Sequence, residues 1–166
     1  MPGAPPFQIR SALGPSDMAE VARLFRSYAA SLSVDLAYQD FETELAHLPG
    51  KYAPPRGALF LALDDLSRAV GCVGLRELGD PGAVELKRLY VSPIARGMGL
   101  GLALVAAAVG EAQRLGYREI KLDTLADMKD AQALYMRYGF EYIPAYYDTP
   151  IAGTVFMRLD LASPTP

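Results

Sequence analysis

A glycine-rich loop between a strand-like segment and a helix-like segment most constrains how this chain folds. Residues 83–91 read AVELKRLYV, and after SPIA the loop RGMGLG (residues 96–101) leads directly into the apolar run LALVAAAVG. Three alternate glycines at the start of a helix expose backbone N–H groups that helix geometry leaves unpaired. These donors, the helix dipole and the side chain of Arg96 together favour an anion such as a pyrophosphate.

Three phosphate-binding motifs compete for this loop, and the spacing of their residues separates them. The ATP- or GTP-binding P-loop ends in Gly-Lys-Ser/Thr, but Gly101 is followed by Leu102 and Ala103, so that interpretation fails. The dinucleotide fingerprint G-x-G-x-x-G requires a third glycine, but Leu102 stands at that position. The fingerprint also follows the first strand of its fold, whereas this loop lies past mid-chain, so the match is weak. The remaining pattern, Arg/Gln-x-x-Gly-x-Gly/Ala, is matched by Arg96, Gly99 and Gly101.

The rest of the chain predicts further strands and helices around this loop. Apolar residues at helical spacing indicate helices, and alternating or apolar runs between Gly, Pro and Asp clusters indicate strands. We expect a strand at residues 7–10, helices from GPSD at 14–17 onward and over 41–48, strands at 58–64, 69–78 and 83–91, a helix at 99–115, a strand at 119–124, a helix at 128–138, and strands at 140–143 and 154–161.

This order predicts the α/β fold class, with a mixed sheet flanked by helices on both faces. The three strands between residues 58 and 91 are joined by short polar turns, which is typical of an antiparallel meander. A length of 166 residues and a hydrophobic content of 51% suit one domain over residues 1–166, with a core at about 7–161.

Composition excludes several classes of function. The formal net charge of −3 argues against general binding to nucleic acid or to a membrane surface, and the longest apolar stretch is too short to span a bilayer. The start MPGAPPFQIR lacks the features of a secretory signal, and one cysteine cannot form an intramolecular disulfide, so we expect a cytoplasmic protein. The single histidine predicts no His-rich metal site.

Two segments resemble the GNAT superfamily of acyl-CoA-dependent N-acetyltransferases. KRLYVSPIARGMGLGLAL resembles that family's strand, pyrophosphate loop and helix, and DAQALYMRYGFEYI resembles its later A-x-x-L-Y-x-x-x-G-F segment. Together they span roughly residues 84–143. The resemblance implies the GNAT fold with a mostly antiparallel sheet, acetyl-CoA as cosubstrate without a metal, and direct attack of an amine on the thioester in a ternary complex.

The resemblance also implies which residues bind the cosubstrate. The strand backbone holds the pantetheine arm, the loop amides hold the pyrophosphate, and a backbone N–H near Val91 donates to the thioester carbonyl. The expected contacts are Leu89, Tyr90 and Val91 for the arm, Arg96, Gly97, Met98, Gly99, Leu100 and Gly101 for the pyrophosphate, and Tyr135 at the cosubstrate. Charge alone predicts that Lys87 and Arg88, close to Arg96 in the chain, offset the phosphates, with Lys129 and Arg137 as more distant candidates. Met128 stands where the family often has an asparagine, which removes one polar contact.

Two residues are candidate catalytic groups. Tyr135 corresponds to the tyrosine of the family's Leu-Tyr pair, and a phenol is a reasonable acid for the departing thiolate. The alternative for Tyr135 is a core aromatic, because it shares a helical stripe with apolar residues. Glu85 lies where the family often places a carboxylate that acts as base toward the amine. The alternative for Glu85 is an exposed strand carboxylate paired with Lys87.

Polarity changes sides within the strand at residues 83–91. Strict alternation places Leu86 and Arg88 on one face but Lys87 and Leu89 on the other. A β-bulge would explain this pattern, and the resemblance implies a splay from the neighbouring strand into which the thioester end fits. A plain twist with both faces covered is the alternative.

The acceptor site is expected where tyrosines of the N-terminal flank meet those of the late strands. Tyr28, Tyr38, Tyr146 and Tyr147 predict an aromatic, partly polar pocket, although tyrosines also pack against each other. The acceptor is a small amine or a peptide or protein amine. A non-catalytic acyl-CoA-binding module, another acyl group and a hydroxyl acceptor are the alternatives. By analogy, the C-terminal strands are a candidate homodimer interface.

Overall fold

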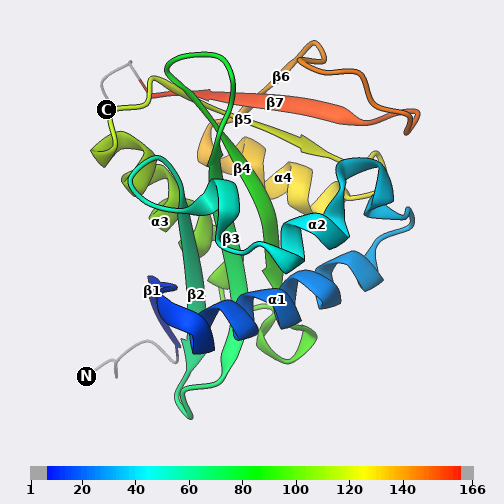
Figure 1. Cartoon of the computed structure of the whole chain (residues 1–166). Helices are drawn as coiled ribbons and strands as arrows, with labels where there is room; N and C mark the ends of the chain where they lie inside the picture. Colours follow the sequence, from blue (N-terminus) through cyan, green and yellow to red (C-terminus); the bar gives the residue numbers. More distant parts are fainter. Residues whose placement is uncertain (1–6, 162–166) are drawn as a thin grey trace.

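A computed structural model describes residues 7–161 of the chain, and these residues form a seven-stranded sheet with the strand order β1-β2-β3-β4-β5-β7-β6 (Figure 1). The strands are β1 (Phe7–Ser11), β2 (Ala58–Asp64), β3 (Ala69–Glu77), β4 (Ala83–Val91), β5 (Glu119–Thr124), β6 (Glu141–Ile143) and β7 (Val155–Asp160). The helices are α1 (Gly14–Ser31), α2 (Phe41–Ala46), α3 (Leu100–Arg114) and α4 (Lys129–Tyr138), with short 3-10 helices η1 (Leu36–Gln39), η2 (Gly50–Tyr52) and η3 (Pro93–Ala95).

The predicted order of elements is confirmed, with differences mainly at the ends of elements. β2, β3 and β4 form the antiparallel meander. Among the strands of residues 7–161, β4 and β5 are the one parallel pair, so this sheet is mixed and mostly antiparallel. The second helix is shorter than predicted: α2 ends at Ala46, and η2 forms in the segment that the sequence predicts as a loop.

Helices cover both faces of the sheet, as predicted (Figure 1). Val21, Leu24 and Phe25 of α1 are buried in one core together with Leu45 of α2. α3 supplies a row of buried residues to a second core on the opposite face, which also contains Tyr135 of α4. Within residues 7–161, no helix combines the length and apolar character needed to cross a membrane.

A β-bulge interrupts β4, as the polarity pattern predicts. Between the pairs Cys72–Tyr90 and Gly74–Lys87, β3 advances by two residues and β4 by three, so β4 contains one extra residue. Arg88 has a positive φ of 61° at this point. The bulge therefore directs the side chains of Lys87 and Arg88 to the same face of the sheet.

β4 and β5 separate soon after they begin to pair. The parallel register starts at Ala83–Glu119 and ends at Glu85–Lys121, although β4 continues to Val91 and β5 to Thr124. On its other side β5 pairs with β7 along its full length. The separation leaves a cleft between the later residues of β4 and β5, at the end of the sheet where β4 leads into the glycine loop.

Candidate active site

The cleft between β4 and β5 brings together residues from three helical elements, α1, η1 and α4, and from both strands. α1 and η1 close one side, and the start of α4 closes the other. Its lining comprises Tyr28, Leu32, Leu36, Tyr38, Gln39, Leu86, Lys87, Arg88, Leu89, Asp123, Thr124, Leu125, Met128 and Tyr135. Of the residues predicted for cosubstrate, acid and acceptor binding, the structure therefore brings Leu89, Tyr135, Tyr28 and Tyr38 to one place.

Tyr135 lies at the α4 side of this cleft and is 6% exposed. Its ring packs against Phe140 with the centroids 5.5 Å apart, so the predicted core contact is also present. Within residues 7–161 its hydroxyl forms no hydrogen bond, and burial raises the pKa of the phenol. The raised pKa keeps the hydroxyl in its neutral, proton-donating form at neutral pH.

Glu85 is buried, not exposed, and its main ion-pair partner is Arg76, not Lys87. Arg76 Nε donates to Glu85 Oε1 over 2.9 Å, whereas Lys87 Nζ lies 3.9 Å from the same oxygen. The hydroxyl of Tyr146 donates to Glu85 Oε2 over 2.6 Å. The interpretation of Glu85 as an exposed strand carboxylate is thus wrong. Glu85 also lies outside the lining of the cleft.

Asp123, at the end of β5, is a cleft carboxylate that the sequence analysis did not identify. The hydroxyl of Tyr147 donates to Asp123 Oδ2, and Gln39 Nε2 donates to the same oxygen over 3.4 Å. Lys87 Nζ lies 3.5 Å from Asp123 Oδ1 and donates to Gln39 Oε1 over 3.2 Å. Burial is the largest influence on Lys87 and lowers its pKa, although Asp123 and Glu85 oppose this shift.

Arg88 extends the charged network toward α2. Its Nε and Nη2 donate to the two oxygens of Glu44 over 3.1 and 3.2 Å, and its Nη1 donates to Gln39 Oε1 over 2.8 Å. Arg76 joins the network because its Nη1 reaches Glu44 over 3.4 Å. Three carboxylates, Glu44, Glu85 and Asp123, therefore face three cations.

The four predicted acceptor-site tyrosines lie in two groups. Tyr28 and Tyr38 line the cleft, and Tyr28 stacks edge-on against Tyr90 of β4 at 6.4 Å. Tyr146 and Tyr147 follow β6, pack edge-on against each other at 5.5 Å, and reach the network only through their hydroxyls. Burial raises the pKa of Tyr28 to about 12 and also raises the pKa of the other three.

The glycine loop has the backbone geometry that a phosphate site requires. Gly97 and Gly99 have positive φ of 84° and 76°, and no atom lies within 4 Å of a Cβ placed at either position. Gly99 is the N-cap of α3, so the amides of Leu100 and Gly101 are among those without an intrahelical acceptor. The open loop fits a pyrophosphate. Gly101 has a different constraint, because its Cβ would lie 3.0 Å from a methyl of Leu134.

Of the cations predicted near the phosphates, Arg96 lies at the loop. Its Nε donates to the carbonyl of Val91 over 3.0 Å, and its guanidinium lies 6.0 Å from the Tyr90 ring centre. Met98 is exposed in the loop and Lys129 is exposed at the start of α4. Lys87 and Arg88 instead point into the buried network, so the interpretation of these two as phosphate ligands is wrong.

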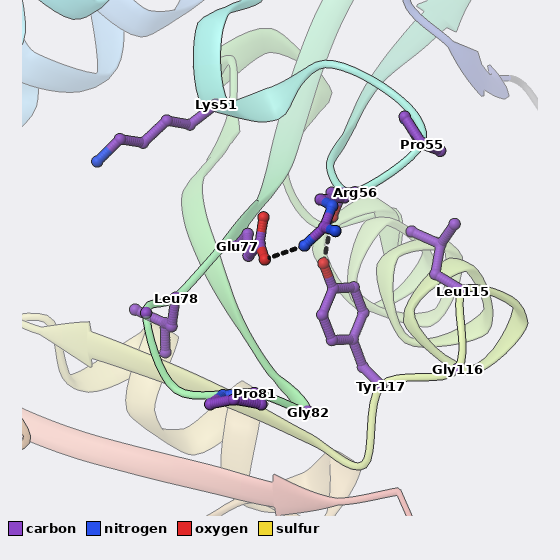
Figure 2. Close-up of a pocket in the computed structure, with 11 residues that line it drawn as sticks. Lys51, Pro55, Arg56, Glu77, Leu78, Pro81, Gly82, Leu115, Gly116 and Tyr117 are labelled. Atoms are coloured by element: carbon purple, nitrogen blue, oxygen red, sulfur yellow. Dashed lines mark hydrogen bonds and ion pairs between the residues drawn. The ribbon is translucent and has the colours of Figure 1, made fainter.

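A second hollow, with a volume of about 710 Å³, lies at the opposite end of β4 (Figure 2). Arg56 Nη1 donates to Glu77 over 2.6 Å, and the Tyr117 hydroxyl donates to the carbonyl of Arg56. Lys51 extends away from this pair (Figure 2). Nine residues of β4 separate this hollow from the glycine loop, a distance of roughly 30 Å. The hollow is open and lacks the convergent groups of the cleft, which we therefore take as the candidate site.

No group of three or more His, Cys, Asp or Glu residues within the part of the chain that the structure describes has a metal-binding arrangement. The acid–base groups in the cleft lining are one carboxylate, Asp123, three tyrosines and Lys87.

Comparisons with known proteins agree with this geometry. The model of the acetyltransferase (GNAT) family matches residues 20–140, which is more than half of the chain. An uncharacterized N-acetyltransferase of Schizosaccharomyces pombe is 38% identical over 148 residues, covering 89% of this chain and 91% of that protein. A GNAT-family acetyltransferase of Staphylococcus aureus has a similar fold, with a TM-score of 0.77 at 21% identity over 93% of this chain and 99% of that one. The Salmonella typhimurium protein yncA, solved with acetyl-CoA, gives a TM-score of 0.72 at 18% identity and 96% coverage of both chains.

Proposed function

The chain belongs to the GNAT acetyltransferase family, and from this premise we propose that it transfers the acetyl group of acetyl-CoA to a primary amine. The observation that carries the proposal is the β4 bulge. It opens a cleft beside β5 that contains Tyr135 and Asp123, and the strand it interrupts leads into the open glycine loop. A turnover site thus lies next to an anion site.

The cosubstrate would be held by backbone groups more than by side chains. The amides of Arg96, Gly97, Met98, Gly99, Leu100 and Gly101 face the pyrophosphate, and the backbone of Leu89, Tyr90 and Val91 faces the pantetheine arm. Arg96 adds one cation at the loop, and Lys129 adds one at the nearby start of α4. Structural neighbours solved with acetyl-CoA support the choice of acetyl-CoA as cosubstrate.

Acetyl-CoA supplies an acyl thioester, and the protein supplies proton transfer and polarisation. A backbone N–H near Val91 donates to the thioester carbonyl, where negative charge develops. Tyr135 holds a proton for the departing thiolate, because its hydroxyl is neutral and has no partner within residues 7–161. Glu85 acts as base through the hydroxyl of Tyr146, which is its link to the acceptor side.

Thermal unfolding with acetyl-CoA, NAD or ATP tests the cosubstrate. A ligand at a hundred times its Kd adds about 2.7 kcal/mol to stability. For a domain of this size we expect a rise in Tm of roughly 5 to 10 °C with acetyl-CoA alone. A rise with NAD or ATP alone would contradict the assignment.

Amine-dependent release of CoA thiol then tests the reaction. We expect release with at least one member of a panel of free amino acids, simple alkylamines, and peptides with a free N-terminus or a lysine. A Tm shift with acetyl-CoA but no thiol release with any of them would indicate a non-catalytic acyl-CoA-binding module.

A further inference from the structure

Two protons must leave the acceptor nitrogen in the proposed reaction. An alkyl amine has a pKa near 10, so it arrives as an ammonium at neutral pH. The C–N bond forms, the C–S bond breaks, and the products are an amide, a thiol and one free proton. One proton lost from nitrogen therefore ends on the thiol sulfur, and the other leaves to solvent. A single base at Glu85 accounts for one of these two transfers.

Asp123 is the one carboxylate in the lining of the cleft among residues 7–161. Its side chain is 9% exposed and shares the cleft with Tyr135, the proposed acid. Glu85 is 3% exposed, and its two oxygens are taken by Arg76 and Tyr146. The two carboxylates thus differ in access: Asp123 lines the cleft, whereas Glu85 lies outside its lining and is bonded by Tyr146.

Each carboxylate has a tyrosine whose hydroxyl donates to it. Tyr146 donates to Glu85 and the adjacent Tyr147 donates to Asp123. Because these hydroxyl hydrogens point at the carboxylates, the remaining lone pairs of the two phenol oxygens are left to accept from an ammonium. Lys87 Nζ lies between the carboxylates, 3.9 Å from Glu85 and 3.5 Å from Asp123.

Resting on the proposed function, we propose that Asp123, positioned by Tyr147, is a second proton acceptor for the amine, separate from the Tyr146–Glu85 pair. One carboxylate takes the proton that the ammonium loses before attack, and the other takes the proton that nitrogen loses after the C–N bond forms. The first proton passes to solvent, and the second is delivered to the thiolate by way of Tyr135.

Other titratable groups surround Asp123 and belong in any analysis of its pH dependence. Lys87 faces it from β4 and Tyr147 from the loop after β6. Tyr38 of η1, Tyr28 of α1 and Tyr135 of α4 also interact with its charge, and it raises the pKa of each. All three remain neutral through the range in which the test is made.

The test compares the pH dependence of kcat in wild type and Asp123→Asn, using the fastest acceptor in the amine panel as the probe. Asn preserves the shape of the side chain and an oxygen for Tyr147. We expect kcat near pH 7 to fall at least about tenfold. We also expect the remaining rate to increase with pH across a range in which the wild-type rate is level, because hydroxide replaces the missing base. Asp123→Glu, which retains a carboxylate, should keep the wild-type profile.

Asp127→Asn is the matched control, because Asp127 is an exposed acid four residues after Asp123, on the connection between β5 and α4. It should leave kcat and its pH profile unchanged. A loss of kcat in Asp123→Asn that is the same at every pH, or no loss, would overturn the proposal. The absence of thiol release by wild type with every amine of the panel would instead refute the proposed function. The Tm shift with acetyl-CoA, unchanged in both variants, shows that the fold and cosubstrate site are intact.

Discussion

The hydroxyl of Tyr146 donates to Glu85 Oε2 over 2.6 Å and joins the loop after β6 to the middle of β4. Burial raises the pKa of Tyr146, and the charge of Glu85 raises it further, so the hydroxyl stays protonated and its donation to Glu85 is retained. The contact links an element of the acceptor side to a strand of the candidate cosubstrate cleft. Removal of either partner should therefore affect turnover more than cosubstrate binding.

Tyr146→Phe should lower kcat by at least about tenfold, because Glu85 loses its link to the acceptor side. The free energy of unfolding should fall by about 1.5 to 3 kcal/mol, since the buried carboxylate of Glu85 loses a donor. Steady-state kinetics and chemical denaturation measure the two effects. Tyr142→Phe is the control, because Tyr142 is exposed and donates to a neutral partner, Gln132. Equal rates for Tyr146→Phe and wild type would remove Glu85 from the mechanism.

Tyr135→Phe should lower kcat without lowering the stability of the fold. Because no partner within residues 7–161 bonds the hydroxyl, its removal should leave the free energy of unfolding within about 0.5 kcal/mol of wild type. Loss of the proton donor should lower kcat by about a hundredfold, without a change in the Kd for acetyl-CoA. The neighbouring Tyr138→Phe should change neither quantity. A wild-type rate in Tyr135→Phe would assign this residue to the core alone.

The sequence predicted the parts of the site that depend on neighbouring residues. Strand order, the meander and the glycine loop follow from local patterns of apolar, glycine and proline residues. The β4 bulge was also predictable, because the change of polarity between Lys87 and Arg88 lies within one strand and the register confirms it. The family resemblance identified Tyr135 as a candidate site residue, because the motif that contains it is also a pattern of neighbouring residues.

The charged network could not be predicted, because its partners are far apart in the chain. Glu44 and Arg88 are 44 residues apart, and Gln39 and Asp123 are 84 apart. Nothing in the segment FETELA distinguishes Glu44, which turns inward, from Glu42, which is exposed. One local feature of the sequence could have indicated Asp123, because it is a carboxylate near the end of a strand beside the predicted splay.

Glu44→Ala should destabilise the protein strongly. Arg88 is 2% exposed, and both of its bonds to Glu44 would be lost, leaving a buried guanidinium held by Gln39. Removal of one partner of a buried ion pair costs about 3 kcal/mol or more, which denaturant titration can measure. Glu42→Ala, on the exposed side of the same helix, should cost less than about 0.5 kcal/mol. Similar costs for both variants would show that the network contributes little to stability.

Gly99→Ala should lower stability and affinity for acetyl-CoA, whereas Gly101→Ala should disturb the packing of two helices. At Gly99 the positive φ of 76° costs alanine about 1 to 2 kcal/mol, and the new Cβ stands where a phosphate would approach. Gly99→Asn tolerates this φ better, so it should recover stability but not affinity for acetyl-CoA. At Gly101 the Cβ meets a flexible Leu134 methyl at 3.0 Å, so packing between α3 and α4 is disturbed. Full acetyl-CoA affinity in both Gly99 variants would place the pyrophosphate elsewhere.

Alkaline pH should unfold the protein and ionise buried tyrosines in the same transition. Burial raises the pKa of Tyr28, Tyr52, Tyr135, Tyr146 and Tyr147 above the unfolded value of about 10. A group whose pKa is raised in the folded state contributes stability that is fully present below the unfolded pKa and is lost as pH rises above it. Stability should thus be insensitive to these groups near pH 7 and fall with pH above about 10. The phenolate absorbance of these five residues and the circular dichroism, followed together, should change at the same pH. Ionisation of all ten tyrosines before any loss of circular dichroism would contradict the buried arrangement of these five residues.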